Sequence, residues 1–103
     1  MNIFNQLFGG PQPVDLKPII EEGALLVDVR TPGEFSQGNV KGSVNIPLDS
    51  IPSQLQKFKD KKNIVVFCRS GSRSGQAKIM LEQNGFKNVV NGGTWEDVSQ
   101  YVK

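Results

Sequence analysis

Two short runs of apolar residues constrain the fold of this chain more than any other feature. They are ALLVDV, residues 24–29, and NIVVF, residues 63–67. A strand with one face in water alternates apolar and polar residues, whereas a nearly unbroken apolar run is typical of a strand covered on both faces. Such strands belong to parallel sheets, in which a crossover segment, usually a helix, connects one strand to the next. The two runs therefore predict an α/β fold.

The segments around these runs carry the signals that such a fold requires. Helix-start residues such as Asp15, helix-ending glycines such as Gly85 and apolar residues at helical spacing predict helices within 15–22, 31–38, 50–58, 72–85 and 94–102. In the third of these, the apolar side chains of Ile51, Leu55 and Phe58 share one face. Further short strands are expected within 43–48 and 86–93. The alternation predicts a mostly parallel sheet with helices on both faces.

The chain has 103 residues, which is the size of one domain. The glycine- and proline-rich segment at 9–13 divides it into an N-terminal extension, residues 1–12, and a domain, residues 13–103. The extension carries apolar residues at helical spacing, which predicts a helical turn packed on the domain. Weak docking of this turn to a membrane surface or a partner is the alternative.

Composition excludes several classes of function. The net charge of +2 is too small to indicate nucleic-acid binding. One cysteine and no histidine exclude an internal disulfide, an all-cysteine metal site and catalysis by a Ser–His or Cys–His pair. No metal or other cofactor is expected. No apolar run approaches the roughly 20 residues that span a bilayer, and the first residues lack a signal-peptide pattern. We therefore expect a cytoplasmic protein with no stable membrane insertion.

The single cysteine, Cys68, directly follows the strand at 63–67 and opens the sequence CRSGSRSG. Ligands of open α/β sheets bind in the loops beyond the carboxyl ends of the strands, which is where this loop lies. A free cysteine at the end of a strand is commonly a small buried side chain. A following loop of glycine, serine and arginine has no packing rationale, however, and favours a nucleophile.

Three features of this loop are expected to lower the pKa of Cys68 from the usual value of about 8.5. The helix that begins near 72–74 directs free backbone N–H groups at the loop. Glycines such as Gly71 allow a tight curve that turns successive amides toward one anion. Positive charge gathers here, because residues 61–81 contain five basic residues and no acidic one: Lys61, Lys62, Arg69, Arg73 and Lys78. The sequence thus predicts a thiolate in an anion-binding loop.

The length of the loop indicates which anion it holds. Four residues separate Cys68 from Arg73, and cysteine phosphatases have one more. The shorter ring leaves less room above the sulfur and suits one added sulfur atom rather than a phosphate. The loop also lacks a carboxylic acid for a phosphatase leaving group, and the chain lacks the second cysteine of a redox arsenate reductase. Its glycine spacing does not match a Walker phosphate loop.

Three segments taken together, 25–48, 65–74 and 89–95, resemble a single-domain rhodanese-like sulfurtransferase of the thiosulfate sulfurtransferase type. The resemblance spans residues 13–103. It implies a rhodanese-like three-layer α/β domain with a five-stranded, mostly parallel sheet and helices on both faces. It also implies that a cysteine takes sulfane sulfur from a donor such as thiosulfate, holds it as a persulfide and passes it to cyanide, a thiol or a protein.

Carried over by position, the resemblance makes Cys68 the nucleophile and the persulfide carrier. The expected partners are a small anionic sulfur donor and a thiol or protein acceptor. The substrate-binding residues that it implies follow the cysteine directly: Arg69, Ser70, Gly71, Ser72 and Arg73. The residues that it implies as support for the pocket are Asp28, Arg30 and Ser74, with a direct substrate role for Arg30 as the alternative.

Other matching positions are expected to be structural. Glu34 and Phe35 are assigned to packing and a local ion pair, and Gly92, Gly93 and Trp95 to a turn. Asn39 stands where the family commonly has a histidine that forms structural hydrogen bonds, so this departure leaves the chemistry untouched.

Two other functions stay open at this point. One is a binding or regulatory module that kept the fold with little catalysis, and the other is a phosphatase or arsenate-reductase-like activity. The physiological donor and acceptor and the oligomeric state are left open as well.

Overall fold

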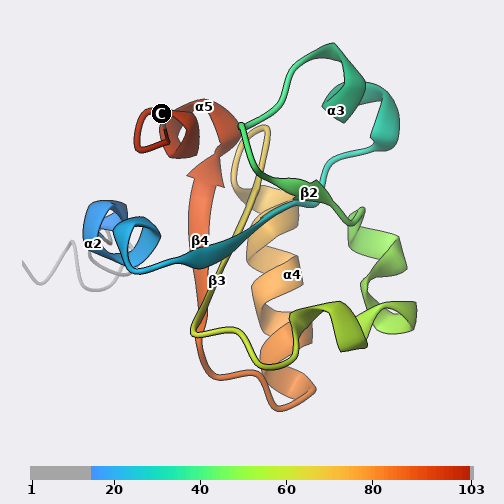
Figure 1. The fold of residues 1–103 in the computed structure, drawn as a ribbon. Helices are drawn as coiled ribbons and strands as arrows, with labels where there is room; N and C mark the ends of the chain where they lie inside the picture. The colour runs from blue at the N-terminus through green and yellow to red at the C-terminus, as the bar shows by residue number, and fades with distance from the viewer. Residues whose placement is uncertain (1–14, 103) are drawn as a thin grey trace, which may run out of the picture.

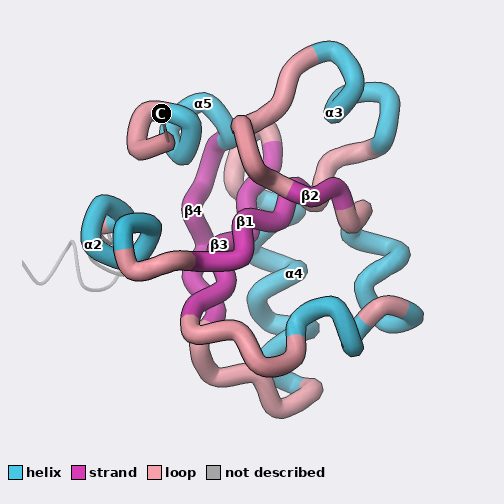
Figure 2. Tube along the Cα trace, viewed as in Figure 1, coloured by secondary structure: helices cyan, strands magenta, loops and turns pink. Residues whose placement is uncertain are grey.

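The computed structural model describes residues 15–102. The N-terminal extension and its expected helical turn lie outside these residues. The described elements, in chain order, are α2 (Leu16–Glu21), β1 (Ala24–Asp28), α3 (Pro32–Gln37), β2 (Val44–Asn45), two 3₁₀ helices η1 (Leu48–Ser53) and η2 (Leu55–Phe58), β3 (Asn63–Cys68), α4 (Ser72–Gln83), β4 (Val89–Thr94) and α5 (Trp95–Ser99). Figure 1 shows their arrangement, and Figure 2 shows the strands as a bundle at the centre with helices around it.

The strands form one parallel sheet in the order β2-β1-β3-β4. Both runs that predicted the fold, β1 and β3, are the two inner strands, and they are paired along their whole length from Ala24↔Asn63 to Asp28↔Phe67. The expected parallel α/β fold is confirmed. The number of strands differs from the expectation. The resemblance implied five strands, whereas within residues 15–102 the sheet has four. The chain's own pattern holds only four strand-like runs, and the fifth was implied by the resemblance alone.

Alternate residues of the inner strands pack against different layers, as the period of a strand requires. Val27 and Val66 belong to a core cluster completed by Ala77 and Leu81 of α4. Val65 belongs to a second cluster, which contains Leu26, Phe67, Leu16 of α2 and Val98 of α5. In Figure 1, α4 accordingly lies on one side of the sheet, and α2 and α5 lie on the other. The three-layer arrangement is confirmed.

The expected helix at 50–58 is the main local error. The segment forms η1 and η2 instead, interrupted at Gln54. Pro52 inside η1 has no N–H for an α-helical bond, and short 3₁₀ turns are the usual alternative. The apolar residues were correctly expected to point inward, because Ile51 and Phe58 are fully buried and Leu55 packs on them.

Within residues 15–102, no helix is long and apolar enough to cross a membrane. The same residues contain no group of three or more histidine, cysteine, aspartate or glutamate side chains placed to hold a metal ion.

Candidate active site

Cys68 is the last residue of β3 and lies where the strand passes into α4. Its side chain is fully buried and belongs to the core cluster beneath α4. The loop between the two elements contains only Arg69, Ser70 and Gly71. Gly71 has a φ of 95°, a left-handed conformation that residues with a side chain rarely adopt. This conformation turns the chain sharply enough to begin the helix directly above the sulfur.

The sulfur of Cys68 lies among hydrogen-bond donors. The Gly71 N–H donates to Sγ at 3.0 Å, and Ser74 Oγ lies 3.5 Å from Sγ. Burial alone would raise the pKa of Cys68, but hydrogen bonds from Ser74 and from the backbone N–H groups of Ser70 and Gly71 outweigh it and hold the pKa below its usual value. The loop therefore favours a thiolate, as its sequence indicated.

Ser74 is held in turn by a residue that sequence reasoning missed. Ser74 Oγ lies 2.7 Å from Oδ1 of Asn91, which projects from β4, and 3.1 Å from the carbonyl oxygen of Gly71. Asn91 also accepts from the Gly93 N–H at 2.9 Å. Strand alternation places Asn91 on the same face as Val89, which packs toward α4. A polar residue on this inward face was the sequence signal that could have identified Asn91 as part of the site.

Arg73, which was expected to attract the anionic donor, is instead paired with an acidic residue. Its guanidinium donates to both carboxylate oxygens of Glu34, at 2.8 and 3.2 Å. The ion pair lowers the pKa of Glu34 to about 2 and raises the pKa of Arg73. Glu34 also closes a capping box with Thr31 at the start of α3. The local excess of positive charge is therefore smaller than residues 61–81 alone suggested.

Asp28 and Arg30, the expected pocket support, form a buried ion pair at the end of β1. Arg30 Nη2 lies 2.7 Å from Asp28 Oδ2, and the two side chains are 5% and 0% exposed. Arg30 Nη2 also donates to the carbonyl oxygen of Gly38 at 2.6 Å, and its guanidinium lies 4.7 Å from the centre of the Trp95 ring. Arg30 thus ties β1 to α3 and α5.

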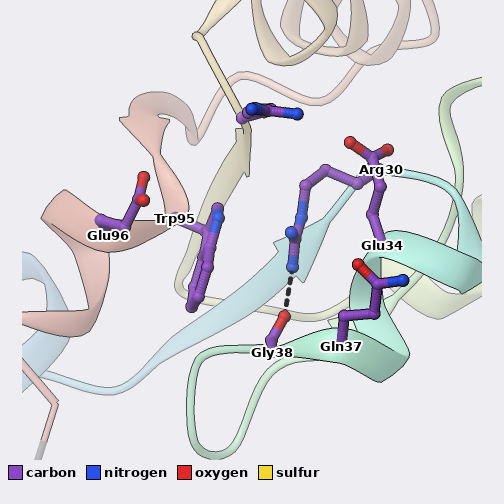
Figure 3. A pocket seen from close by; sticks show the side chains of 7 residues that line it. Arg30, Glu34, Gln37, Gly38, Trp95 and Glu96 are labelled. Atoms are coloured by element: carbon purple, nitrogen blue, oxygen red, sulfur yellow. Dashed lines mark hydrogen bonds between the residues drawn. The ribbon is translucent and has the colours of Figure 1, made fainter.

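An open pocket of about 390 Å³ lies beside this pair. Its lining residues are Arg30, Glu34, Gln37, Gly38, Arg69, Trp95 and Glu96. Figure 3 shows Arg30 beside the Trp95 ring at the centre, with Glu34 and Gln37 projecting from α3. Arg69 connects the pocket to the cysteine loop because it directly follows Cys68, which does not itself line the pocket. Within residues 15–102 neither Arg69 nor Glu96 forms an ion pair.

The remaining predicted positions have simpler surroundings. Ser70 and Ser72 are exposed on the loop and at the start of α4. Asn39 donates from Nδ2 to the carbonyl oxygen of Phe35 at 3.0 Å, at the end of α3. The structure therefore brings together Cys68, its loop, Ser74 and the Asp28–Arg30 pair at the carboxyl edge of the sheet.

Comparison with known proteins identifies the family of this chain. The sequence model of the rhodanese-like domain family matches residues 12–96 of this chain. The chain belongs to this family. The match includes the Asp28–Arg30 pair, the Cys68 loop and the strand that carries Asn91.

The chain is also similar to individual proteins that are named sulfurtransferases or rhodaneses. The chain is 40% identical to a sulfurtransferase of Allochromatium vinosum over 68% of its own length and 65%, just under two thirds, of the relative's length. It is 36% identical to the thiosulfate sulfurtransferase PspE of Escherichia coli over 71% of this chain and 72% of that one. A solved structure described as rhodanese with anions from E. coli matches with a TM-score of 0.66 and 35% identity, over 73% of this chain and 91% of that one.

Proposed function

We propose that this protein is a sulfurtransferase that moves sulfane sulfur from a small anionic donor, such as thiosulfate, to a thiol, cyanide or a protein acceptor. The observation that carries the proposal is the sulfur of Cys68, which accepts from the Gly71 N–H at 3.0 Å in the short loop between β3 and α4. Named sulfurtransferases among the relatives support it.

The chemistry balances without an imidazole base. The Cys68 thiolate attacks the outer sulfur of thiosulfate and forms a new S–S bond. The S–S bond of thiosulfate breaks, and sulfite leaves with the electron pair. An acceptor nucleophile, for example cyanide, then attacks the outer sulfur of the persulfide. Thiocyanate leaves, and the Cys68 thiolate returns. No proton changes hands, so the absence of histidine costs nothing.

Donor binding is assigned to the cysteine loop and the adjoining pocket. The backbone N–H groups from Arg69 to Arg73 surround the transferred sulfur, and the Arg69 guanidinium attracts the donor's sulfonate group. Arg30 is already bound to Asp28 and Gly38, so its proposed role is support of the pocket wall. Cys68 has no exposed surface in the structure, so the proposal includes a shift of loop residues as the donor arrives.

Steady-state transfer from thiosulfate to cyanide tests the proposal. Cys68→Ser should abolish turnover, because serine is a far weaker nucleophile and cannot carry the sulfur. Arg69→Ala should raise the KM for thiosulfate about five- to tenfold with a smaller change in kcat, as expected for loss of one charged contact. Lys87→Ala, which removes one exposed positive charge before β4, is the matched control and should leave KM unchanged.

Substantial turnover by Cys68→Ser would contradict the mechanism. Wild-type protein that forms no persulfide with any donor would favour a binding or regulatory module on the same fold. The cytoplasmic location stays a prediction of the sequence.

A further inference from the structure

Asn91 makes contacts with the cysteine loop that the proposed mechanism does not use. Its Oδ1 accepts from the Gly93 N–H at 2.9 Å, and its Nδ2 lies 3.3 Å from the carbonyl oxygen of Gly71. An amide N–H can only donate and a carbonyl oxygen can only accept, so these two neighbours fix which end of the side-chain amide is which. The oxygen of Asn91 is therefore the atom that faces Ser74, at 2.7 Å from its hydroxyl.

The hydroxyl of Ser74 has one hydrogen and three acceptors within reach. These are Asn91 Oδ1 at 2.7 Å, the Gly71 carbonyl oxygen at 3.1 Å and Cys68 Sγ at 3.5 Å. Asn91 Oδ1 carries no hydrogen, so Ser74 must be the donor in the shortest of the three contacts. With its hydrogen directed at Asn91, Ser74 can only accept from sulfur. This arrangement satisfies a Cys68 thiol, whose S–H donates to Ser74, and withholds one donor from a thiolate.

We propose that Asn91 is a positioning residue that controls the charge state of Cys68 through the direction of the Ser74 hydroxyl hydrogen. When Cys68 loses its proton to solvent, the Ser74 hydrogen turns from Asn91 to the sulfur. The Ser74–Asn91 hydrogen bond is lost in that step, which opposes ionisation. A hydrogen bond to an ionised acceptor is the stronger of the two, so the hydrogen does turn. The inference rests on the proposed role of Cys68 as the nucleophile.

Other charged groups lie around the cysteine loop. Arg69 lies in the loop and Arg73 in α4, Glu34 projects from α3, the Asp28–Arg30 pair lies at the end of β1, and Glu96 lies in the first turn of α5. Within residues 15–102, no hydrogen bond or ion pair joins any of these side chains to Asn91. Asn91 is itself exposed. Truncating it therefore changes the hydrogen-bond partners of Ser74, Gly71 and Gly93 and leaves the surrounding charges in place.

The test is a pH titration of the Cys68 thiolate by its ultraviolet absorbance, on fully reduced protein without any sulfur donor, with Cys68→Ser as the blank. Asn91→Ala should lower the pKa of Cys68 by about half a unit, because ionisation then breaks only the longer Ser74 bond to the Gly71 carbonyl oxygen, at 3.1 Å, in place of the 2.7 Å bond to Asn91. Ser74→Ala should raise it, because the thiolate loses a donor. The double variant should titrate like Ser74→Ala alone.

A matched control is Asn88→Ala. Asn88 lies just before β4, the strand that carries Asn91, and its side chain donates to the carbonyl oxygens of Lys61 and Lys62. It should leave the pKa of Cys68 unchanged. A raised pKa in Asn91→Ala would contradict the proposal, because it would mean that Asn91 acts by bracing Gly71. An unchanged pKa, or a double variant that differs from Ser74→Ala, would overturn it too. The titration needs no sulfur transfer, so this inference and the proposed function can fail separately.

Discussion

Single residues at this site do two jobs, holding the sulfur of Cys68 and holding the elements that surround it. Arg73 illustrates the second. The sequence suggested that its charge serves the anion, but in the structure its Nη1 and Nη2 atoms both donate to Glu34 of α3. That ion pair joins the start of α4 to the start of α3. Both partners retain a quarter to a third of their exposure, so the pair is a partly solvated link rather than a buried one.

Glu34 should make stability depend on pH. Its pKa falls from 4.5 in the unfolded chain to about 2 in the folded protein. A lowered pKa stabilises the fold above the unfolded value, so this contribution is complete above about pH 4.5 and is lost as the pH falls toward 2. Glu34→Gln should reduce the free energy of unfolding at pH 7 by about 1 kcal/mol or less, and the difference from wild type should vanish at low pH.

Urea unfolding at several pH values measures this difference. Glu82→Gln, which breaks the exposed Lys78–Glu82 pair within α4, is the control and should have a smaller effect at pH 7. A Glu34→Gln difference that stays constant down to pH 2 would show that the ion pair with Arg73 is not its source.

Breaking the buried pair of Asp28 and Arg30 should destabilise the protein more than breaking the Glu34–Arg73 pair. Arg30→Met leaves the carboxylate of Asp28 charged, fully buried and without its partner, a change that costs about 3–5 kcal/mol. Replacing both residues at once, with Asn at 28 and Met at 30, should cost less than the single substitution. Thermal unfolding of both variants measures which one is less stable. A single variant that is as stable as the double variant would contradict the prediction.

At the scale of the elements, β4 sets how closely α5 and β3 approach each other. Its register against β3 shifts between Val66 and Phe67, so that Val66 pairs with Asn91 and Phe67 with Gly93. Gly92 is the extra residue of this bulge. A Cβ at Gly92 would lie 2.8 Å from Val98 Cγ2 and 2.9 Å from Val65 Cγ1. Only glycine fits between these two side chains without a shift.

Gly92→Ala should therefore destabilise the protein by about 1–3 kcal/mol, the usual cost of overpacking a core. Gly33→Ala is the control, because a Cβ there would meet nothing within 4 Å and alanine favours the helix α3. It should be neutral or slightly stabilising. Equal losses in both variants, measured by urea unfolding, would mean that the close approach at Gly92 is not what limits substitution.

Sequence patterns predicted the elements of this fold better than the contacts between them. The apolar runs of β1 and β3 placed the inner strands, and the last residue of β3, Cys68, was recognisable as the candidate nucleophile. Glu34 and Arg73, however, lie 39 positions apart, and Asn91 and Ser74 lie 17 apart. No local periodicity relates such pairs, because the sheet order brings them together. The helix expected at 50–58 is absent for a local reason, because Pro52 has no N–H to donate to an α-helical hydrogen bond.

At the scale of the whole molecule, the parallel sheet places the cysteine loop, the buried pair and the Trp95 pocket at one edge. Cys68 is the last residue of an inner strand, whereas the groups that contact its sulfur come from the loop and from α4, and Asn91 of β4 contacts Ser74. We propose that this arrangement makes Cys68 the carrier of one sulfur atom. The substrate-binding roles proposed for the loop depend on it.

Intact-mass analysis after treatment with thiosulfate tests that claim most directly. The wild-type protein should gain the mass of one sulfur atom, and the gain should disappear on addition of cyanide or a thiol. The Cys68→Ser variant should gain nothing. A wild-type mass that is unchanged by thiosulfate and by low-molecular-weight persulfides, or a gain that persists in Cys68→Ser, would contradict the account.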